Sequence, residues 1–262
     1  MRKGMIDPTS IFGRKAREYA SYRPSYPSEL MDFLQGMLES KPDPVIADLG
    51  CGTGIFSRLL VEANFTVVGI EPDALMRKAC RSVLNSSSRF TLLQGRAEAT
   101  GLASQSTDAI VAAQSFHWFD IAESRREFAR ILREPGFVFL VWNERRKGGT
   151  RFLEDLDDVL GQMVAESALE IRDHDVRPEI LAERLFGSDR FDVRGFANEQ
   201  ILGAEGLVGR FMSTSYAPAP NSWRYGVWRQ GLEDVYRKHC NEYGVIVQYD
   251  TIAISGLIDP SL

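Results

Sequence analysis

The stretch "VIADLGCGTGIFSRLL", residues 45–60, decides the fold class of this chain. An apolar run ends at Asp48 and is followed by Gly50, Gly52 and Gly54, after which apolar residues return at helical spacing. Glycine tolerates a positive φ and lets a ligand approach the main chain closely. The first N–H groups of a helix have no partner within the helix and point outward. The stretch therefore predicts a strand, a ligand-binding turn and a helix.

The same strand–helix alternation continues to about residue 145. Near-continuous apolar runs are typical of strands that helices cover on both faces. The pattern predicts strands at 45–49, 66–70, 90–94, 108–113 and 137–142, and helices at 28–40, 55–63, 73–84 and 122–133, the first with Ser28 as its N-cap. This alternation indicates the α/β class, with a doubly wound and mostly parallel sheet.

Beyond residue 145 the alternation stops. Helical spacing covers 152–186 and 204–240, and two further stretches read as strands that bring the sheet to seven. We predict one domain over 1–262, with an N-terminal lid at 1–40, a cofactor-binding core at 41–145, helical cap insertions at 146–190 and 200–240, and late strands at 191–199 and 244–254. An independent second domain at 145–240 is the alternative.

Composition and charge narrow the classes of function. The 262 residues carry a net charge of −5 without a long basic run, which argues against binding nucleic acid through its backbone. The three cysteines form no CxxC pair, so we expect neither a disulfide framework nor a metal site. We find no signal peptide and no apolar stretch of membrane-spanning length. We expect a soluble, cytoplasmic protein without a membrane partner; its oligomeric state stays open.

The spacing of the glycines bears on the ligand. A dinucleotide-binding GxGxxG pattern needs glycine at position 55, which is Ile55. Asp48, directly before the glycines, repels a pyrophosphate but suits an ammonium or sulfonium group. Glu71 ends the next strand, where folds of this kind bind ribose hydroxyls, and a carboxylate accepts from both hydroxyls of one ribose. The pattern favours a positively charged nucleoside.

These stretches resemble a known family. "VIADLGCGTG" and "VVGIEPDALM" resemble motifs I and II of the class I S-adenosylmethionine-dependent methyltransferases. Three further stretches resemble its type 11 and trans-aconitate methyltransferase branch: "YASYRPSYP" (19–27), "AAQSFHWF" (112–119) and "PGFVFLVWN" (135–143). The resemblance covers about residues 10–145. One departure is "REPGF" (133–137), where the family has a second glycine. The resemblance implies a Rossmann-like methyltransferase fold and S-adenosylmethionine as cofactor.

Carried over residue by residue, the resemblance implies a set of cofactor contacts. It places Asp48 and the main chain of Gly50, Cys51 and Gly52 at the methionine part, Glu71 at the ribose, Pro72, Met76, Ala97 and Glu98 around the adenine, Gln114 beside the sulfonium, and Tyr19 and Arg23 over the carboxylate end. Strand ends support the set independently, because ligands of open α/β sheets bind at the carboxyl edge. Asp48, Glu71, Glu98, Gln114 and Asn143 all fall at or just past the carboxyl end of a predicted strand.

His117 is the candidate catalytic residue, as a substrate contact or general base, because its ordinary pKa is near neutral pH. Packing between two aromatic residues is the alternative. Arginines and aromatic side chains in the lid and caps favour a small acidic or amphipathic methyl acceptor, with Arg23, Arg145 and Arg146 meeting its acidic group. We predict methyl transfer from S-adenosylmethionine to a small molecule. A non-catalytic sensor of this cofactor and an NAD-dependent oxidoreductase are the alternatives.

Overall fold

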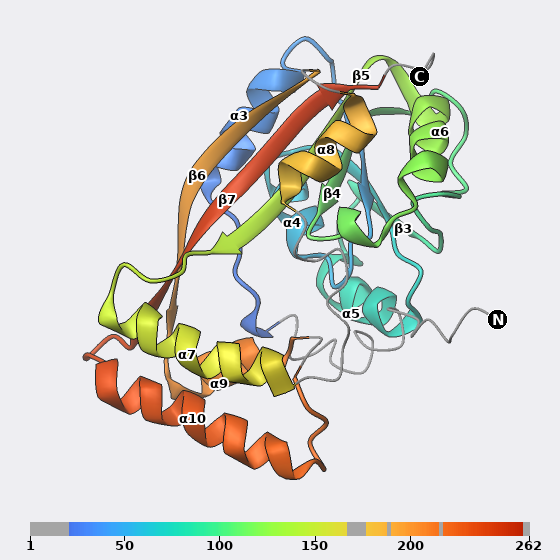
Figure 1. The fold of residues 1–262 in the computed structure, drawn as a ribbon. Coiled ribbons are helices and arrows are strands. Elements are labelled where there is room, and N and C mark those ends of the chain that lie inside the picture. The colour runs from blue at the N-terminus through green and yellow to red at the C-terminus, as the bar shows by residue number, and fades with distance from the viewer. Residues whose placement is uncertain (1–20, 167–176, 188–189, 215–216, 259–262) are drawn as a thin grey trace, which may run out of the picture.

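A seven-stranded sheet with helices on both faces forms the centre of the protein (Figure 1). The structure is a computed structural model that describes residues 21–166, 177–187, 190–214 and 217–258. In chain order its elements are α3 (Ser28–Leu38), β1 (Val45–Leu49), α4 (Ile55–Glu62), β2 (Thr66–Ile70), α5 (Ala74–Leu84), β3 (Phe90–Leu93), β4 (Thr107–Ala113), the 3-10 helix η1 (Phe116–Trp118), α6 (Ile121–Ile131), β5 (Leu132–Arg145), α7 (Arg151–Glu166), α8 (Pro178–Phe186), β6 (Phe191–Leu202), α9 (Ala204–Met212), α10 (Trp223–His239) and β7 (Val245–Leu257).

The strand order is β3-β2-β1-β4-β5-β7-β6. The first five strands in this order run parallel, and β7 runs antiparallel to both β5 and β6. The prediction of an α/β, seven-stranded, mostly parallel sheet is confirmed. The order reverses between β1 and β4, and open sheets of this kind bind ligands at such a switch point, outside the carboxyl ends of the strands.

Alternate residues of the central strands enter two different cores. In β1, Ile46 packs with α3 and α4 on one face, and Ala47 packs with α6 and α8 on the other. Phe139 and Leu140 of β5 divide in the same way. Because successive side chains of a strand point to opposite faces, the continuous apolar runs in the sequence are what a sheet covered on both faces requires.

Helices α7, α9 and α10 gather beyond one end of the long β6–β7 pair and form what we call the helical lobe (Figure 1). They enclose a core of their own, into which Leu202 of β6 and Tyr249 of β7 project. Helix α8 lies within the predicted 146–190 insertion but packs on the sheet with Leu181 and Phe186. None of the described helices is long and apolar enough to cross a membrane.

Two local expectations need correction. The segment "REPGF" lies inside β5, which begins at Leu132 and not at the expected residue 137: Thr107 pairs with Leu132 and Ala109 with Phe137, so the intervening residues of β5 form a bulge. Helix α3 has Pro27 as its N-cap, and Ser28 instead donates its hydroxyl to Glu29. Proline at this position needs no acceptor for its own main-chain nitrogen, since it has no N–H group. Neither change alters the sheet order.

Candidate active site

Each of the three glycines in the turn between β1 and α4 has a left-handed backbone. Gly50, Gly52 and Gly54 have φ values of 67°, 57° and 85°. A Cβ on Gly50 would lie 2.7 Å from the Cβ of Ser115, and one on Gly54 would lie 2.8 Å from the sulfur of Cys80. A Cβ on Gly52 would meet no atom closer than 4.0 Å. Gly50 and Gly54 therefore allow the side chains of Ser115 and Cys80 to pack closely against the turn, and Gly52 leaves room beside the main chain for a ligand.

Asp48 at the end of β1 is fully buried, with 1% of its surface exposed. Its Oδ2 accepts a hydrogen bond from Ser57 Oγ at 2.5 Å, and its Oδ1 has no hydrogen-bond partner. Burial raises the pKa of Asp48 to about 7, even though the Ser57 hydrogen bond opposes the shift. An unsatisfied buried carboxylate oxygen is costly in the free protein. A cationic ligand would satisfy it.

Glu71 follows β2 and ties two loops together. Its Oε2 accepts from the N–H of Gly52 at 2.9 Å, and its Oε1 accepts from the N–H of Asp73 at 2.8 Å. Burial raises the pKa of Glu71 above its ordinary value. Each oxygen keeps a further lone pair, so the carboxylate is able to accept from ribose hydroxyls while it holds the glycine turn.

The turn after Glu71 is held from behind. Arg77 Nη1 donates to the carbonyl oxygens of Glu71 at 2.8 Å and Pro72 at 2.7 Å. Asp73 caps α5 by accepting from the N–H groups of Leu75 and Met76. The Met76 side chain is buried beneath this turn. The sequence singled out Pro72 and Met76, but the arginine that fixes their main chain looked like any other basic residue of a helix.

The ends of β4 and β5 join the site to the N-terminal segment. Gln114 adopts a φ of 56° and donates from Nε2 to the carbonyl oxygen of Asn143 at 3.1 Å. Asn143 Nδ2 donates to the carbonyl oxygen of Ser25 at 3.0 Å, and Asn198 Nδ2 donates to the same oxygen at 2.8 Å. The Asn143 Oδ1 accepts from Thr251 Oγ1 at 2.5 Å. Asn143 thus holds together the segments at Ser25, Gln114 and Thr251, which are distant in sequence.

A cavity of about 90 Å³ lies among these elements. Most ligand sites exceed about 300 Å³, so this cavity has room for only one end of a cofactor-sized ligand. Six predicted cofactor residues line it, and so do eight residues that were not assigned to the cofactor. The six are Arg23, Asp48, Gly50, Cys51, Gly52 and Gln114, and the eight are Pro24, Tyr26, Thr53, Ile55, Phe56, Ala113, Asn143 and Arg210.

The other predicted residues lie outside this cavity. Glu71, Pro72 and Met76 surround the turn after β2, and Ala97 is buried in the loop after β3. Tyr19 lies outside the described residues. Cys51 contributes its main chain to the cavity wall, whereas its thiol packs against Cys80 and Leu84. The hydrogen bond with Cys80, together with burial, raises the pKa of the Cys51 thiol well above its ordinary value.

Glu98 and His117 do not line the cavity. The Glu98 Oε1 accepts from the N–H of Asp120 at 2.8 Å, which attaches the loop after β3 to the start of α6. His117 lies in η1, its ring 5.2 Å from that of Trp118, and does not line the cavity. The structure therefore places neither side chain at the enclosed end of the site.

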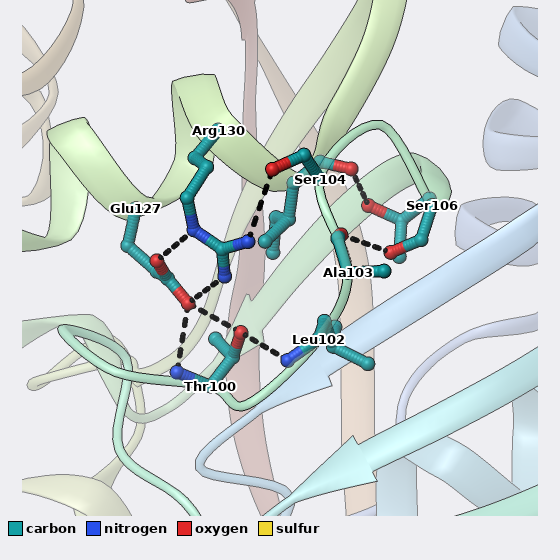
Figure 2. Close-up of polar contacts among 9 residues, drawn as sticks. Thr100, Leu102, Ala103, Ser104, Ser106, Glu127 and Arg130 are labelled. Atoms are coloured by element: carbon teal, nitrogen blue, oxygen red, sulfur yellow. Dashed lines mark hydrogen bonds and ion pairs between the residues drawn. The ribbon is translucent and has the colours of Figure 1, made fainter.

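Helix α6 also holds this loop at its far side (Figure 2). Glu127 Oε1 accepts from both the N–H of Thr100 at 2.8 Å and its hydroxyl at 2.5 Å. Arg130 donates to both oxygens of Glu127 at 2.8 Å and reaches Ser104 Oγ at 3.4 Å. Ala97 and Glu98, two of the residues predicted at the adenine, are thus carried on a loop that α6 holds at two points.

The prediction that Arg145 and Arg146 meet an acidic substrate is corrected. Arg145 pairs with Asp157 of α7, and Arg146 Nη2 lies 2.6 Å from Asp250 of β7. Both guanidinium groups already have a carboxylate of the chain, and neither residue lines the cavity. Arg210 of α9 lines it instead. Nothing in the sequence around Arg210 distinguished it, because its nearness to Asp48 depends on tertiary packing.

Comparison with known proteins agrees with this geometry. A family model described as a methyltransferase domain matches residues 47–140. An uncharacterised methyltransferase of Mycobacterium tuberculosis is 35% identical over 175 residues, which cover 66% of each chain. A methyltransferase-like protein of Schizosaccharomyces pombe is 29% identical over 156 residues, 58% of each chain. The match thus spans about two thirds or less of the length of these curated relatives.

Solved structures share the fold. A structure described as a type II methyltransferase from Anaeromyxobacter dehalogenans superposes with a TM-score of 0.70 at 21% identity, covering 91% of this chain and 99% of that one. A methyltransferase of an antibiotic biosynthesis pathway from Anabaena variabilis gives a TM-score of 0.58 at 19% identity, covering 89% and 98%. The family rests on the match over residues 47–140 and on the relative from Mycobacterium tuberculosis, and the glycine turn and the buried Asp48 agree with it. The chain therefore belongs to the class I methyltransferases, enzymes that use S-adenosylmethionine as cofactor.

Proposed function

We propose that this protein transfers the methyl group of S-adenosylmethionine to a small acidic or amphipathic molecule, as the type 11 and trans-aconitate branch resemblance implies. One observation carries the proposal. A single cavity is lined both by the glycine turn with Asp48 and by Tyr26, Phe56 and Arg210 from outside that turn. A cofactor on the turn would therefore face apolar walls and a cation that suit a compact acceptor.

The cofactor supplies a methyl group on a sulfonium sulfur, which makes it electrophilic. The protein's own contribution is to align the acceptor and exclude water, worth several kcal/mol when the geometry is right. Asp48 and the main chain of Gly52 would hold the cationic methionine end, and Glu71 the ribose. Asp48, the only carboxylate among the described residues of the cavity wall, faces the cofactor side. That lining contains no histidine or lysine, which favours an acceptor that is nucleophilic without losing a proton, such as a carboxylate.

Binding and turnover test this function separately. We expect calorimetry to detect S-adenosylmethionine and S-adenosylhomocysteine but not NAD. We expect release of S-adenosylhomocysteine with at least one member of a panel of small organic acids. Cofactor binding without turnover on any acid, amine, thiol or phenol would favour a sensor and contradict the proposal. Turnover confined to tRNA or protein would contradict the small acceptor.

A matched glycine pair assigns the binding to the turn. Gly52 and Gly101 both have positive φ, 57° and 76°, and a Cβ on either meets no close neighbour. Alanine is therefore strained to a similar degree at both positions, but only at Gly52 does its methyl group enter the cavity. We expect Gly52→Ala to weaken cofactor affinity at least tenfold by calorimetry, and Gly101→Ala to leave it unchanged. Equal affinities in the two variants contradict cofactor binding at this turn.

A further inference from the structure

Arg210 is a buried cation at the edge of the cavity. It lies in the last turn of α9, in the helical lobe, with 8% of its surface exposed. Every other charged residue of the described cavity wall comes from the sheet core or from the segment 21–27. The helical lobe therefore contributes a positive charge to the same cavity that the glycine turn lines.

The guanidinium group has one hydrogen bond and no ion pair among the described residues. Its Nε donates to the hydroxyl of Tyr249 at 3.1 Å, and that hydroxyl donates to Gln200 Oε1 at 3.3 Å. The guanidinium carbon lies 5.2 Å from the ring centroid of Phe211 and 5.8 Å from that of Tyr249. Nη1 is buried without a hydrogen-bond partner. These contacts fix the orientation of the guanidinium group and leave Nη1 without an acceptor.

Such an arrangement is expensive in the free protein. A buried charge without a counter-ion, with an unsatisfied donor, opposes folding. The carbonyl end of α9 and the two aromatic rings offset part of this cost, but neither supplies an acceptor for Nη1. Other arginines of similar burial have acceptors for their outer nitrogens: Arg145 pairs with Asp157, and Arg77 donates to the carbonyl oxygens of Glu71 and Pro72. None of the described residues supplies an anion to Arg210, so a bound anion would satisfy it.

Counting charges indicates which anion. S-adenosylmethionine carries one carboxylate, and the cavity wall holds two arginines, Arg23 and Arg210. Arg23 lies on the N-terminal segment, which the family resemblance places over the carboxylate end of the cofactor. A second guanidinium group remains for a second anion. Guanidinium groups bind carboxylates through two parallel N–H···O bonds, which also fixes orientation.

We propose that Arg210 binds a carboxylate of the methyl acceptor and thereby selects acidic substrates. This inference rests on the proposed function, since it requires that the acceptor share the cavity with the cofactor. The Tyr249–Gln200 pair is a positioning device that holds the guanidinium group by its Nε. Phosphate or sulfate groups offer the same charge, but the two-pronged fit favours the planar carboxylate.

Three variants test the assignment: Arg210→Met, Arg210→Lys and Arg23→Met. Thermal unfolding of the protein loaded with S-adenosylhomocysteine is followed with mono-, di- and tricarboxylates, with the amide of each acid, and with inorganic phosphate and sulfate. We expect at least one acid, but not its amide, to raise the unfolding temperature of the parent protein. Arg210→Met should abolish this shift, and Arg210→Lys should reduce it. A shift from phosphate or sulfate alone contradicts the carboxylate assignment.

Kinetics and stability separate substrate binding from a structural role. With an acid that is methylated, we expect Arg210→Met to raise KM about 10- to 100-fold, the range expected for a lost charge-assisted hydrogen bond. The same variant should unfold at or above the parent's temperature, because Met removes an unpaired buried charge. A lower unfolding temperature together with an unchanged KM would make Arg210 structural.

The two arginines also distinguish the two sources of carboxylate. We expect Arg23→Met, but not Arg210→Met, to weaken binding of S-adenosylhomocysteine in calorimetry. The opposite result assigns Arg210 to the cofactor and overturns the inference, while methyl transfer stands. An acid shift that depends on Arg210 without any methyl transfer leaves the anion site intact and overturns the proposed function. No shift with any acid overturns the anion site itself.

Discussion

At the scale of single residues, Asp48 combines nearly complete burial with an oxygen that no group of the described chain satisfies. Burial raises the pKa of this carboxyl to about 7, against the lowering effect of the Ser57 hydrogen bond. A bound cation favours the carboxylate over the acid, so cofactor binding at pH 6 should release a proton. We expect affinity for S-adenosylmethionine to rise with pH and level off above about pH 7. Calorimetry in buffers of different ionisation enthalpy measures both effects.

The same residue makes a prediction about stability. Between its ordinary pKa of 3.8 and its folded pKa of about 7, Asp48 holds a proton in the folded protein but not in the unfolded chain. Its contribution to stability is therefore fully present below pH 3.8 and is lost as pH rises through 7. Asp48→Asn should match the parent near pH 4 and be more stable at pH 8, by on the order of 3 kcal/mol. Parallel curves from urea unfolding would contradict the raised pKa.

At the scale of elements, α6 holds the loop between β3 and β4 through Glu127 (Figure 2). Burial raises the pKa of Glu127, but hydrogen bonds from Arg130 and Thr100 outweigh it and lower that pKa to about 2. Glu127→Ala leaves the N–H of Thr100 buried without its acceptor. We expect it to cost about 2–3 kcal/mol in urea unfolding at pH 7. Glu123→Ala, which removes an exposed pair on the same helix, should cost less than about 1 kcal/mol.

The pH dependence of this contact has the opposite sign to that of Asp48. Because the folded pKa of Glu127 is depressed, its stabilisation is present above the ordinary value of 4.5 and is lost as pH falls toward 2. The stability difference between the parent and Glu127→Ala should shrink across this range. A difference that stays constant from pH 5 to pH 2.5 would show that the carboxylate is not the contributing group.

The bounds of some elements could be predicted from neighbouring residues alone. The apolar runs and the cap at Asp73 predict β1, β2 and α5 to within one residue of their observed bounds. The bulge in β5 did not follow in the same way, since it depends on pairing between Thr107 and Leu132 across two strands. The contact of Glu98 could not be predicted for the same reason: its partner, the N–H of Asp120, belongs to a different element.

At the scale of the whole molecule, the N-terminal segment 21–27 bridges the sheet and the helical lobe. Ser25 accepts from Asn143 and Asn198, and Tyr22 accepts through its carbonyl oxygen from Gln200 Nε2 at 3.0 Å. The Tyr22 ring lies against Gly209 of α9, where an added Cβ would come within 2.4 Å of it. Arg23 is the next residue after Tyr22. The position of Arg23 at the cavity therefore depends on the contact between Tyr22 and Gly209.

Gly209→Ala tests this bridge. The added methyl group should displace Tyr22 and Arg23, and we expect cofactor affinity to fall about tenfold, consistent with an overpacking cost of about 1–3 kcal/mol. Gly161→Ala in α7 is the matched control, because a Cβ there meets no atom within 4 Å. It should leave affinity unchanged and raise the unfolding temperature by about 2–4 °C, as alanine favours the helix. Equal affinities in the two variants would show that the segment does not position the site.

The sequence by itself determined the strand–turn–helix at residues 45–60, the acid at the end of each of the first two strands, and the family. These features depend on neighbours a few residues apart, which spacing and residue type specify directly. Only the tertiary structure decided that Arg145 and Arg146 are paired within the chain and that Arg210 lines the cavity with no ion pair to a described residue. The physical reason is that the charge environment of a side chain is set by groups that folding brings together from distant segments.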